Sequence, residues 1–336
     1  MKNLRKVLFP FAAGYGGVTS LRNYFYNQGY WESKSYELPV ICVGNLSVGG
    51  TGKTPMIEWL IRLLKEDYSV AVLSRGYKRN TTGFIEVLTT NTAEEVGDEP
   101  LQFKQKFPKV TVAVCADRRT GINRIKDAAD VILLDDAFQH RKVKPSFSIL
   151  LTSYLDPYFK DFLLPAGNLR ESRKGADRAN VIIATKVPPH TAYAKMQEFK
   201  FLVDSLPEQK VYFSKIDYAQ ELIGKTETLA LDYLVNKKFT LVTGIANPTP
   251  LVDFLKEQGF NFEHRKFPDH HSFSDSEIES LRKEELIITT EKDYMRLKED
   301  LQKYALYYLP IKTEILNNQS QFLRKHVLEH VRNFKN

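Results

Sequence analysis

Cysteine is scarce in this chain of 336 residues, which contains Cys42 and Cys115 alone. Two cysteines cannot build a disulfide framework or a cysteine-rich zinc cluster, so small disulfide-bonded secreted proteins and zinc-finger proteins are excluded. Both cysteines lie in apolar, strand-like runs. This usage is typical of a protein that works in a reducing cytosol.

A long hydrophobic run is also missing. The apolar stretch at residues 7–18 is interrupted by Pro10 and is shorter than the roughly 20 apolar residues of a spanning helix. A secretory signal, an amphipathic helix packed on the protein and a membrane-interface segment all fit such a stretch. We favour the interface segment, because aromatic side chains can enter the acyl boundary while Lys and Arg meet anionic head groups. The flanking basic and aromatic residues are Lys2, Arg5, Lys6, Arg22, Tyr24, Phe25, Tyr26, Tyr30 and Trp31.

Charge of one sign does not dominate the chain. The 48 Lys and Arg residues against 41 Asp and Glu residues give a net charge of +7. This moderate excess suits an anionic membrane surface, a phosphorylated substrate or nucleic acid equally well, and so excludes none of them. With 43% hydrophobic and 26% charged residues, the composition is that of a globular protein.

Apolar, often β-branched runs alternate with helical stretches from residue 40 to about 215. Several runs are continuously apolar, as expected for strands buried on both faces. The alternation predicts an α/β fold with a mostly parallel sheet and helices on both faces. The expected strands are residues 40–43, 70–73, 84–88, 110–115, 131–134, 148–151, 181–184 and 211–213, and the expected helices lie near 55–66, 99–106, 118–128 and 191–204.

A second alternating block follows a loosely patterned stretch near residues 215–236. Its expected elements are strands at 240–243, 286–289 and 307–311, a helix from about 248 and a closing helix near 318–333. We therefore expect three parts: an N-terminal membrane-associated helical segment over residues 1–35, a large domain over 36–220 and a smaller α/β domain over 221–336.

Residues 40–58 carry the most informative pattern, an apolar run followed by a glycine-rich turn and a helix that begins near Gly52-Lys53-Thr54. Glycine lets the backbone approach a ligand closely, and the N–H groups of the turn and helix N-terminus favour a phosphate. Lys53 would place a cation on the β/γ-phosphates, and the Thr54 hydroxyl would ligate Mg²⁺. The nucleotide-binding residues predicted here are Ser47, Val48, Gly49, Gly50, Thr51, Gly52, Lys53 and Thr54.

This loop departs from the usual phosphate-loop pattern, because Ser47 stands where a glycine is expected. The alternative is a glycine-rich connection between a strand and a helix that binds no ligand. The order of strand, loop, Gly-Lys-Thr and amphipathic helix favours a phosphate loop of the kind found in P-loop NTPases.

Two carboxylates end the apolar run at residues 131–134, about eighty residues after the loop. In phosphate-loop enzymes such a strand lies beside the loop strand, and its terminal acid holds Mg²⁺ directly or through water. Asp135 and Asp136 are therefore candidate metal ligands. Gln139 and His140 follow closely and are expected at the same sheet edge, where ligands of open α/β sheets bind.

Several other polar groups allow two interpretations each. Asp98 is either an N-cap, which spacing alone favours, or a functional acid. Arg119, with Arg118 before it, either clamps a phosphate or begins a solvated helix. Arg170 lies in a turn-rich loop and is a candidate for substrate binding.

Two motifs in the second block are equally ambiguous. Residues 267–273 group an acid with His270 and His271 just before a helix, where one histidine is expected to be an ordinary surface residue. Residues 289–293 end an apolar strand with charged groups, which either contact a nucleotide or cap a helix.

Together these pieces resemble one family, the tetraacyldisaccharide 4′-kinases of lipid A synthesis. The similar stretches occur in order between residues 43 and 293, and Ser47 is part of the family's own pattern. DDAFQHR and the serine-containing loop are the most distinctive. The stretches are VGNLSVGGTGKTP (43–55), LSRGYKR (73–79), VGDEP (96–100), CADRR (115–119), LLDDAFQHR (133–141), LLPAGNLRE (163–171), FPDHH (267–271) and TEKD (290–293).

The resemblance implies transfer of the ATP γ-phosphoryl group, with Mg²⁺, to the 4′-hydroxyl of an acylated disaccharide 1-phosphate. It implies that Asp98 is the catalytic base, oriented by His270, and that Lys53 acts on the transferring phosphates. It also implies a peripheral or monotopic enzyme on the cytoplasmic face of the inner membrane, with no nucleic acid and no obligate protein partner. The further expected contacts are Arg119, Arg170 and His140 for the substrate, and Thr54, Asp135, Asp136 and Gln139 for the metal.

Two other functional classes stay open on the residues alone. A nucleotidase that switches a partner protein, such as a metal-delivery ATPase, also has a Gly-Gly-rich loop. A non-enzymatic binder of membranes or nucleic acid would fit the basic charge and the aromatic N-terminus. Turnover stimulated by a protein and not by lipid would favour the first, and absence of ATP binding the second.

Overall fold

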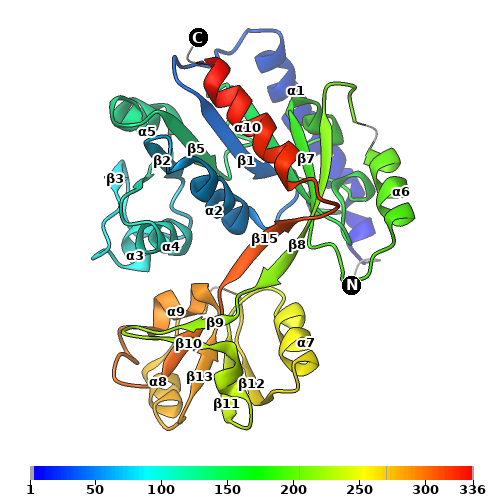
Figure 1. The fold of residues 1–336 in the computed structure, drawn as a ribbon. Helices are drawn as coiled ribbons and strands as arrows, with labels where there is room; N and C mark the ends of the chain where they lie inside the picture. Colours follow the sequence, from blue (N-terminus) through cyan, green and yellow to red (C-terminus); the bar gives the residue numbers. More distant parts are fainter. Residues whose placement is uncertain (1–3, 204, 270, 335–336) are drawn as a thin grey trace.

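The computed structural model describes residues 4–203, 205–269 and 271–334, which form two lobes, each built on its own β-sheet (Figure 1). The large lobe contains a nine-stranded sheet in the order β15-β8-β7-β6-β1-β5-β2-β4-β3. The seven strands from β8 to β4 run parallel, and β15 and β3 are antiparallel edges. The strands are β1 (Val40–Asn45), β2 (Val70–Ser74), β3 (Ile85–Glu86), β4 (Thr111–Val114), β5 (Val131–Asp135), β6 (Phe147–Ser153), β7 (Val181–Thr185), β8 (Lys210–Tyr218) and β15 (Ile311–Ile315).

The central strands are buried on both faces, as their continuous apolar runs predict. In β1, Ile41 and Val43 pack into one hydrophobic cluster and Val40 and Cys42 into another. Because alternate residues of a strand point to opposite faces, helices must cover both sides. The first cluster includes residues of α2 (Lys53–Leu64), α4 (Asp98–Lys106) and α10 (Ser320–Phe334), and the second includes residues of α5 (Arg118–Ile125) and α6 (Tyr193–Val203). The fold is therefore α/β with a large, mostly parallel sheet. The remaining helices of this lobe are α3 (Ala93–Val96) and the 3₁₀ helices Lys126–Ala128, Tyr158–Lys160 and Arg173–Arg178.

The small lobe contains a six-stranded sheet in the order β10-β9-β14-β13-β11-β12. Four strands are parallel, and β9 and β10 add an antiparallel edge. The three-residue strands β9 and β10 and the six-residue strand β12 were not predicted. The strands are β9 (Glu221–Ile223), β10 (Thr228–Ala230), β11 (Lys238–Thr243), β12 (Asn261–Lys266), β13 (Ile287–Thr289) and β14 (Leu306–Tyr308), and the helices are α7 (Thr249–Glu257), α8 (Asp275–Leu281), α9 (Glu291–Leu297) and the 3₁₀ helix Leu231–Leu234.

The C-terminal part of the chain differs from the expected division at residue 221, because β15 and α10 lie in the large lobe. The run expected to be one strand at residues 307–311 is two strands in two different sheets, separated at Pro310. Proline has no N–H to give to a strand ladder and favours such a break. After it, β15 pairs with β8, and Leu323 and Val327 of α10 are buried in the core of the large lobe. Figure 1 shows β8 and β15 as the two strands that join the lobes.

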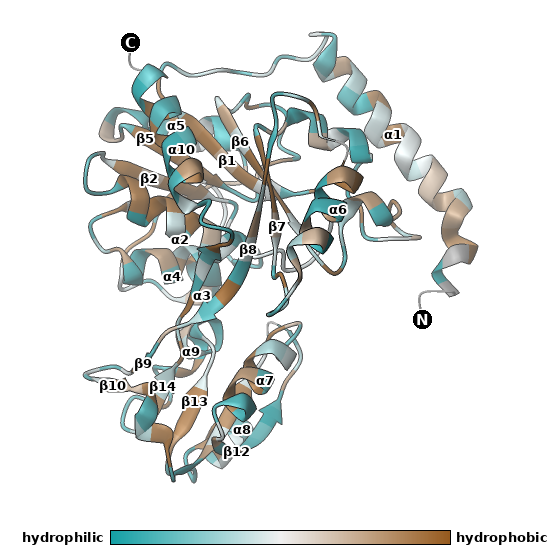
Figure 2. Ribbon diagram, turned by 45° about the vertical axis from the view of Figure 1, so that its right-hand side comes forward, coloured by the Kyte–Doolittle hydropathy of each residue, from teal (hydrophilic) through white to brown (hydrophobic). Residues whose placement is uncertain are grey.

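The N-terminal helix α1 (Phe9–Asn27), preceded by a 3₁₀ helix at Leu4–Leu8, lies along the outside of the large lobe (Figure 2). One face is packed, with Ala12, Gly16 and Thr19 buried. The exposed surface of the helix carries large apolar side chains, including Phe11 and Val18. No helix within the described ranges combines the length and hydropathy needed to cross a membrane.

Candidate active site

The glycine-rich loop joins β1 to α2 at the carboxyl end of the parallel strands. Gly52 is the N-cap residue of α2 with φ 84°, and Gly49 has φ 108°. Both values are left-handed conformations that glycine adopts at little cost. A Cβ atom on Gly49 would meet no neighbour within 4 Å, so backbone conformation rather than crowding favours glycine there. Val48, Gly49 and Gly50 are exposed, so the loop and the start of α2 form an accessible surface of the kind that binds anions.

Thr51 fixes the loop from inside. Its hydroxyl accepts a hydrogen bond from the Asn45 amide at 2.9 Å, and its carbonyl accepts one from the Thr185 hydroxyl at the end of β7 at 2.8 Å. Thr51 is buried. Its side chain therefore holds the shape of the predicted nucleotide loop.

Two contacts hold the outer part of the same loop. The Val48 N–H donates to the Asn168 carbonyl at 2.8 Å, and the Lys186 ammonium donates to the Gly50 carbonyl at 2.6 Å. Partial desolvation, with the Lys292 and Lys53 ammonium groups nearby, lowers the pKa of Lys186. Lys186 is thus a second cation beside the loop, in addition to Lys53.

Asp135 ends β5, the strand next to β1, and is buried. The Ser74 hydroxyl at the end of β2 donates to its Oδ2 at 3.1 Å. Burial, together with the nearby carboxylates of Asp136 and Glu99, raises the pKa of Asp135 to about 6, although the Lys53 ammonium opposes this. The group is therefore a carboxylate that is poorly compensated by its surroundings.

Asp136 follows directly in left-handed backbone, with φ 48°. Its Oδ1 lies 3.7 Å from Nζ of Lys53, and Thr54 lies next to Lys53 in the first turn of α2. Carboxylate and hydroxyl oxygens are the ligands that Mg²⁺ prefers, and a divalent cation would offset the repulsion between Asp135 and Asp136. These residues fit a magnesium site.

Arg170 brings the loop at residues 163–171 to this group. Its Nη1 donates to Oδ1 and Oδ2 of Asp136 at 3.0 and 3.2 Å and lies 3.4 Å from Oε1 of Gln139. The Gln139 amide donates in turn to the Asn45 carbonyl at 2.8 Å. Lys53, Asp136, Gln139 and Arg170 are therefore brought together.

Glu171 is a fully buried carboxylate behind this group, and no sequence pattern singled it out. It accepts hydrogen bonds from the Gln139 amide at 3.1 Å, from Arg178 at 2.8 Å and from Asn23 of α1 at 2.7 Å. A buried charge is stable only with such partners. Glu171 therefore links α1 to the candidate metal site.

His140 and Arg119 form a separate group around Asp117. The Asp117 Oδ1 atom lies 3.8 Å from Nε2 of His140 and 3.8 Å from Nε of Arg119. Burial, with the nearby Arg118 guanidinium, lowers the pKa of His140 to about 4, so the ring is neutral near pH 7. Arg118 itself is buried and donates to the carbonyl oxygens of Cys115, Ala116 and Asp135, so it is neither a solvated residue nor a phosphate clamp.

Asp98 begins α4, and the N-cap position belongs to Gly97, which has φ 92°. The interpretation of Asp98 as the N-cap is therefore wrong by one residue, because Asp98 is the first residue of the helix. Its carboxylate is paired with the Arg296 guanidinium of α9, across the contact between the lobes. His270, the expected partner of Asp98, lies outside the described residues.

The neighbouring histidine has a local role. His271 lies with Nε2 2.9 Å from Oε2 of Glu277, and its ring stacks on Phe267 at 5.0 Å between centroids. Glu277 also completes a capping box with Ser274 at the start of α8. These contacts stabilise the turn that precedes α8.

The TEKD motif caps α9 and joins the two lobes. The Thr290 hydroxyl accepts a hydrogen bond from the Asp293 N–H. Lys292 pairs with Glu99, and Glu291 accepts from Lys106 at 2.9 Å. The helix-cap interpretation is confirmed, and the charged residues contact the large lobe.

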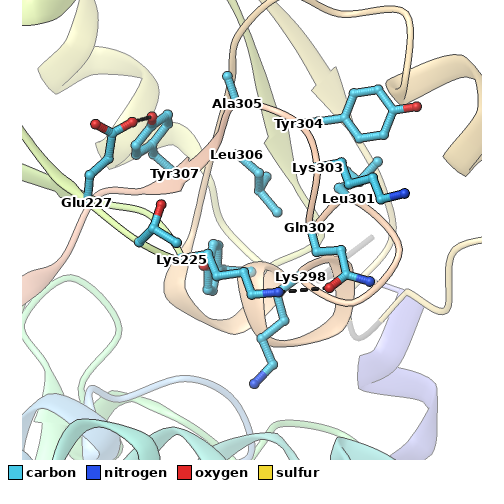
Figure 3. Close-up of a pocket in the computed structure, with 12 residues that line it drawn as sticks. Lys225, Glu227, Lys298, Leu301, Gln302, Lys303, Tyr304, Ala305, Leu306 and Tyr307 are labelled. Carbon is cyan, nitrogen blue, oxygen red and sulfur yellow. Dashed lines mark hydrogen bonds between the residues drawn. The ribbon is translucent and has the colours of Figure 1, made fainter.

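A cavity of about 290 Å³ lies elsewhere in the small lobe (Figure 3). Its wall includes Lys225, Glu227, Gln302 and Tyr307, and Lys225 donates to Gln302 at 2.8 Å. None of the predicted site residues lines it, so it is separate from the candidate active site.

Residues that build the site but were not predicted include Ser74, Glu171, Lys186 and Arg296. Ser74 and Lys186 lie at the carboxyl ends of strands, where polar residues of an open α/β sheet face ligands, and this position is a usable signal. Glu171 binds Asn23 and Arg296 binds Asp98, and both of these partners are more than 100 residues away in the chain. Local sequence carries no sign of such pairs.

Comparison with known proteins identifies the family. The profile of the family described as tetraacyldisaccharide-1-P 4′-kinase matches residues 4–332. A tetraacyldisaccharide 4′-kinase of Flavobacterium johnsoniae is 51% identical over 328 residues, which cover 96% of each chain. One of Bacteroides thetaiotaomicron is 42% identical, covering 98% of this chain and 94% of its own.

A solved structure agrees with these relatives. The crystal structure of LpxK from Aquifex aeolicus in complex with ATP superposes with a TM-score of 0.80 at 31% identity, covering 98% of this chain and 99% of that one. Sequence and fold are thus similar over nearly the whole length. The protein belongs to the tetraacyldisaccharide 4′-kinase family.

Proposed function

We propose that this protein transfers the γ-phosphoryl group of ATP to the 4′-hydroxyl of a tetraacyldisaccharide 1-phosphate in lipid A synthesis. The observation that carries the proposal is the group formed by Lys53, Asp135 and Asp136 beside the glycine-rich loop. Family membership makes the chain an ATP-dependent kinase and removes the switch-protein and non-enzymatic alternatives.

The glycine-rich loop holds the nucleotide. Residues 47–54 surround the phosphates, and the backbone N–H groups from Gly49 onward, with the N-terminus of α2, hydrogen-bond them, since the Val48 N–H is already bonded to Asn168. Lys53 neutralises charge on the phosphates. Thr54, Asp135, Asp136 and Gln139 would hold Mg²⁺, which would supply positive charge to the phosphate oxygens. Arg170, already paired with Asp136, fixes that carboxylate and binds the transferring group or the substrate phosphate.

Asp98 is the base that removes the proton of the sugar hydroxyl. A carboxylate within reach of an attacking hydroxyl accelerates transfer, because the proton leaves as the oxygen attacks. The nearly buried position of Asp98, at the start of α4 and beside the small lobe, supports this role. His270 orients the carboxylate, as the family resemblance implies.

Arg119 and His140 contact the substrate from the group around Asp117. Arg119 is partly exposed, so its guanidinium can reach a phosphate. His140 is a neutral hydrogen-bonding group near pH 7, because its pKa is lowered to about 4.

The outer face of α1 binds the cytoplasmic leaflet of the inner membrane as a peripheral or monotopic anchor. Phe11 and Val18 expose 70% and 71% of their surface, and Phe9, Leu21 and Tyr24 are exposed as well. Helices of this kind lie in the interface with their apolar side chains among the acyl chains. The position suits an enzyme whose acceptor carries acyl chains.

The test is incubation of the purified protein with γ-labelled ATP, Mg²⁺ and a tetraacyldisaccharide 1-phosphate, followed by location of the label on the lipid. Label at the 4′-position, with none transferred when the acceptor lacks a free 4′-hydroxyl, is the expected result. Release of labelled phosphate without any labelled lipid would contradict the proposal.

A further inference from the structure

The small lobe contributes an arginine to Asp98. Nε of Arg296 lies 3.1 Å from Oδ1 of Asp98, and Nη2 donates to Oδ2. The two side chains are 13% and 11% exposed. This is a bidentate guanidinium–carboxylate pair, which fixes the plane of the carboxylate as well as its place.

Arg296 is itself fixed from behind. Its Nη1 lies 3.3 Å from Oδ1 of Asp293, a fully buried residue. Asp293 accepts hydrogen bonds from the Gly244 N–H at 2.8 Å and from the Thr290 hydroxyl at 2.7 Å. A continuous series of polar contacts therefore runs from the loop after β11, through α9, to Asp98.

The charges around Asp98 are mixed. Besides Arg296 and Asp293 of α9, Lys292 of the same helix and Glu99 of α4 act on it electrostatically. Lys292 and Glu99 pair with each other. Arg296, in contrast, binds both carboxylate oxygens of Asp98 directly, through Nε and Nη2.

We infer that Arg296 is a positioning residue for Asp98, so that the small lobe sets the orientation of the base. The inference rests on the proposed role of Asp98 and adds a residue to it. A carboxylate has about four acceptor positions, so a bidentate guanidinium orients it without using all of them. The attacking hydroxyl can then meet an oxygen whose direction is fixed by α9.

The same contact couples the base to the lobe interface. Movement of α9 relative to α4 changes the direction of the Asp98 carboxylate, because the arginine is locked to Asp293. A misplacement of about 1 Å in such a group can cost about 10²-fold in rate. Arg296 therefore acts on kcat rather than on nucleotide affinity.

The experiment compares Arg296→Met, Arg296→Lys and Lys106→Met by kcat, KM for ATP and the acid limb of the kcat/KM profile. We expect Arg296→Met to lower kcat by about 10- to 100-fold with little change in KM for ATP. Its acid limb should move to higher pH, because a guanidinium favours the charged form of a neighbouring carboxyl group. Arg296→Lys should keep the acid limb near its wild-type pH, because lysine keeps the positive charge. It should restore kcat only in part, because lysine lacks the planar pair of donors that binds both carboxylate oxygens.

Lys106→Met is the matched control, since Lys106 bridges Glu58 and Glu291 in the same interface without contacting Asp98. It should lower the thermal stability and leave the acid limb in place. Equal effects of Arg296→Met and Lys106→Met on kcat and the limb would show a purely structural role and overturn the inference. If Arg296→Met does not fold, Arg296→Lys and Arg296→Gln take its place. An unchanged kcat and an unchanged acid limb in both of these variants would also overturn the inference.

A double mutant separates the two proposals. Asp98→Asn with full activity would reject Asp98 as the base, whatever the behaviour of Arg296. If Asp98→Asn is impaired, the Asp98→Asn/Arg296→Met variant should be little worse than Asp98→Asn alone, because Arg296 acts through Asp98. A further loss of the full size of the Arg296→Met effect would show that Arg296 acts elsewhere.

Discussion

Nη1 of Arg170 lies within 3.2 Å of both carboxylate oxygens of Asp136. The same Asp136 Oδ1 lies 3.7 Å from Nζ of Lys53. One carboxylate thus connects Lys53, the lysine proposed to bind the phosphates, with the loop at residues 163–171. A change at any of the three residues acts on the other two. Single substitutions here test the site as a unit.

Lys53→Ala should nearly abolish phosphoryl transfer. Loss of a charge-stabilising group of this kind typically costs about 10²–10³ in rate. The measurement is kcat with saturating ATP and acceptor, with Lys186→Ala as the comparison because the Lys186 ammonium donates to the Gly50 carbonyl of the outer loop. Near-normal turnover of Lys53→Ala would contradict the assignment of residues 47–54 as the phosphate-binding loop.

Asp98 and His270 should behave as one catalytic unit. Asp98→Ala should lower kcat by a factor on the order of 10²–10⁴, and His270→Ala should cause comparable damage. The double variant should be little worse than the poorer single variant. Additive losses in the three variants, measured at saturating ATP, would show two independent roles.

The stability of the protein should depend on pH through Asp135. Its pKa, about 6 in the folded protein, lies above the ordinary aspartate value of about 3.9. The folded state therefore holds a proton that the unfolded state releases, and the free energy of unfolding falls as pH rises from about 4 to about 6. Asp135→Asn lacks this loss, so it should gain stability relative to the wild type between pH 4 and pH 7, by at most about 3 kcal/mol.

Thermal unfolding of the wild type and of Asp135→Asn, without Mg²⁺ at pH 4 and at pH 7, measures this difference in stability. Adding Mg²⁺ with ATP should then raise Tm of the wild type more than that of Asp135→Asn, because the variant lacks one of the carboxylates proposed to bind the metal. A Tm difference independent of pH would place the titrating group elsewhere.

Membrane binding should depend on the outer face of α1. Phe11→Asp combined with Val18→Asp should reduce sedimentation with anionic vesicles without lowering Tm, because both side chains are exposed in the folded protein. High salt should release only part of the wild type, since salt screens charge and leaves apolar burial in place. Phe322→Asp, an exposed position of α10, is the control, and an equal loss in that variant would argue against α1.

Most of the large sheet could be predicted from the sequence, because a strand buried on both faces is a continuous apolar run. The predictions at residues 40–43, 131–134 and 181–184 correspond to β1, β5 and β7. β12 was not predicted, because its sequence NFEHRK is largely polar and its residues are exposed or half-buried. The strand expected at residues 307–311 failed since its assignment depends on pairing with β8, a partner about 95 residues away.

The candidate site followed a similar pattern. The glycine-rich loop and Asp135-Asp136 are local signals, since a turn that needs φ > 0 and a strand that ends in an acid can be read from adjacent residues. The predicted N-cap of α4 was displaced by one residue, because Gly97, with φ 92°, takes the cap position in place of Asp98. Arg296 could not be predicted, because its partner is 198 residues away and belongs to the other lobe.

The return of β15 and α10 to the large sheet makes the small lobe an insertion between two neighbouring strands. Tyr218 of β8 and Ile311 of β15 are register partners, so the inserted chain leaves and re-enters at one point. Leu323 and Val327 follow the whole small lobe in the chain, yet they complete the core of the large lobe. The large lobe therefore reaches its native packing only after the small lobe has been synthesised, and the small lobe is the part free to fold first.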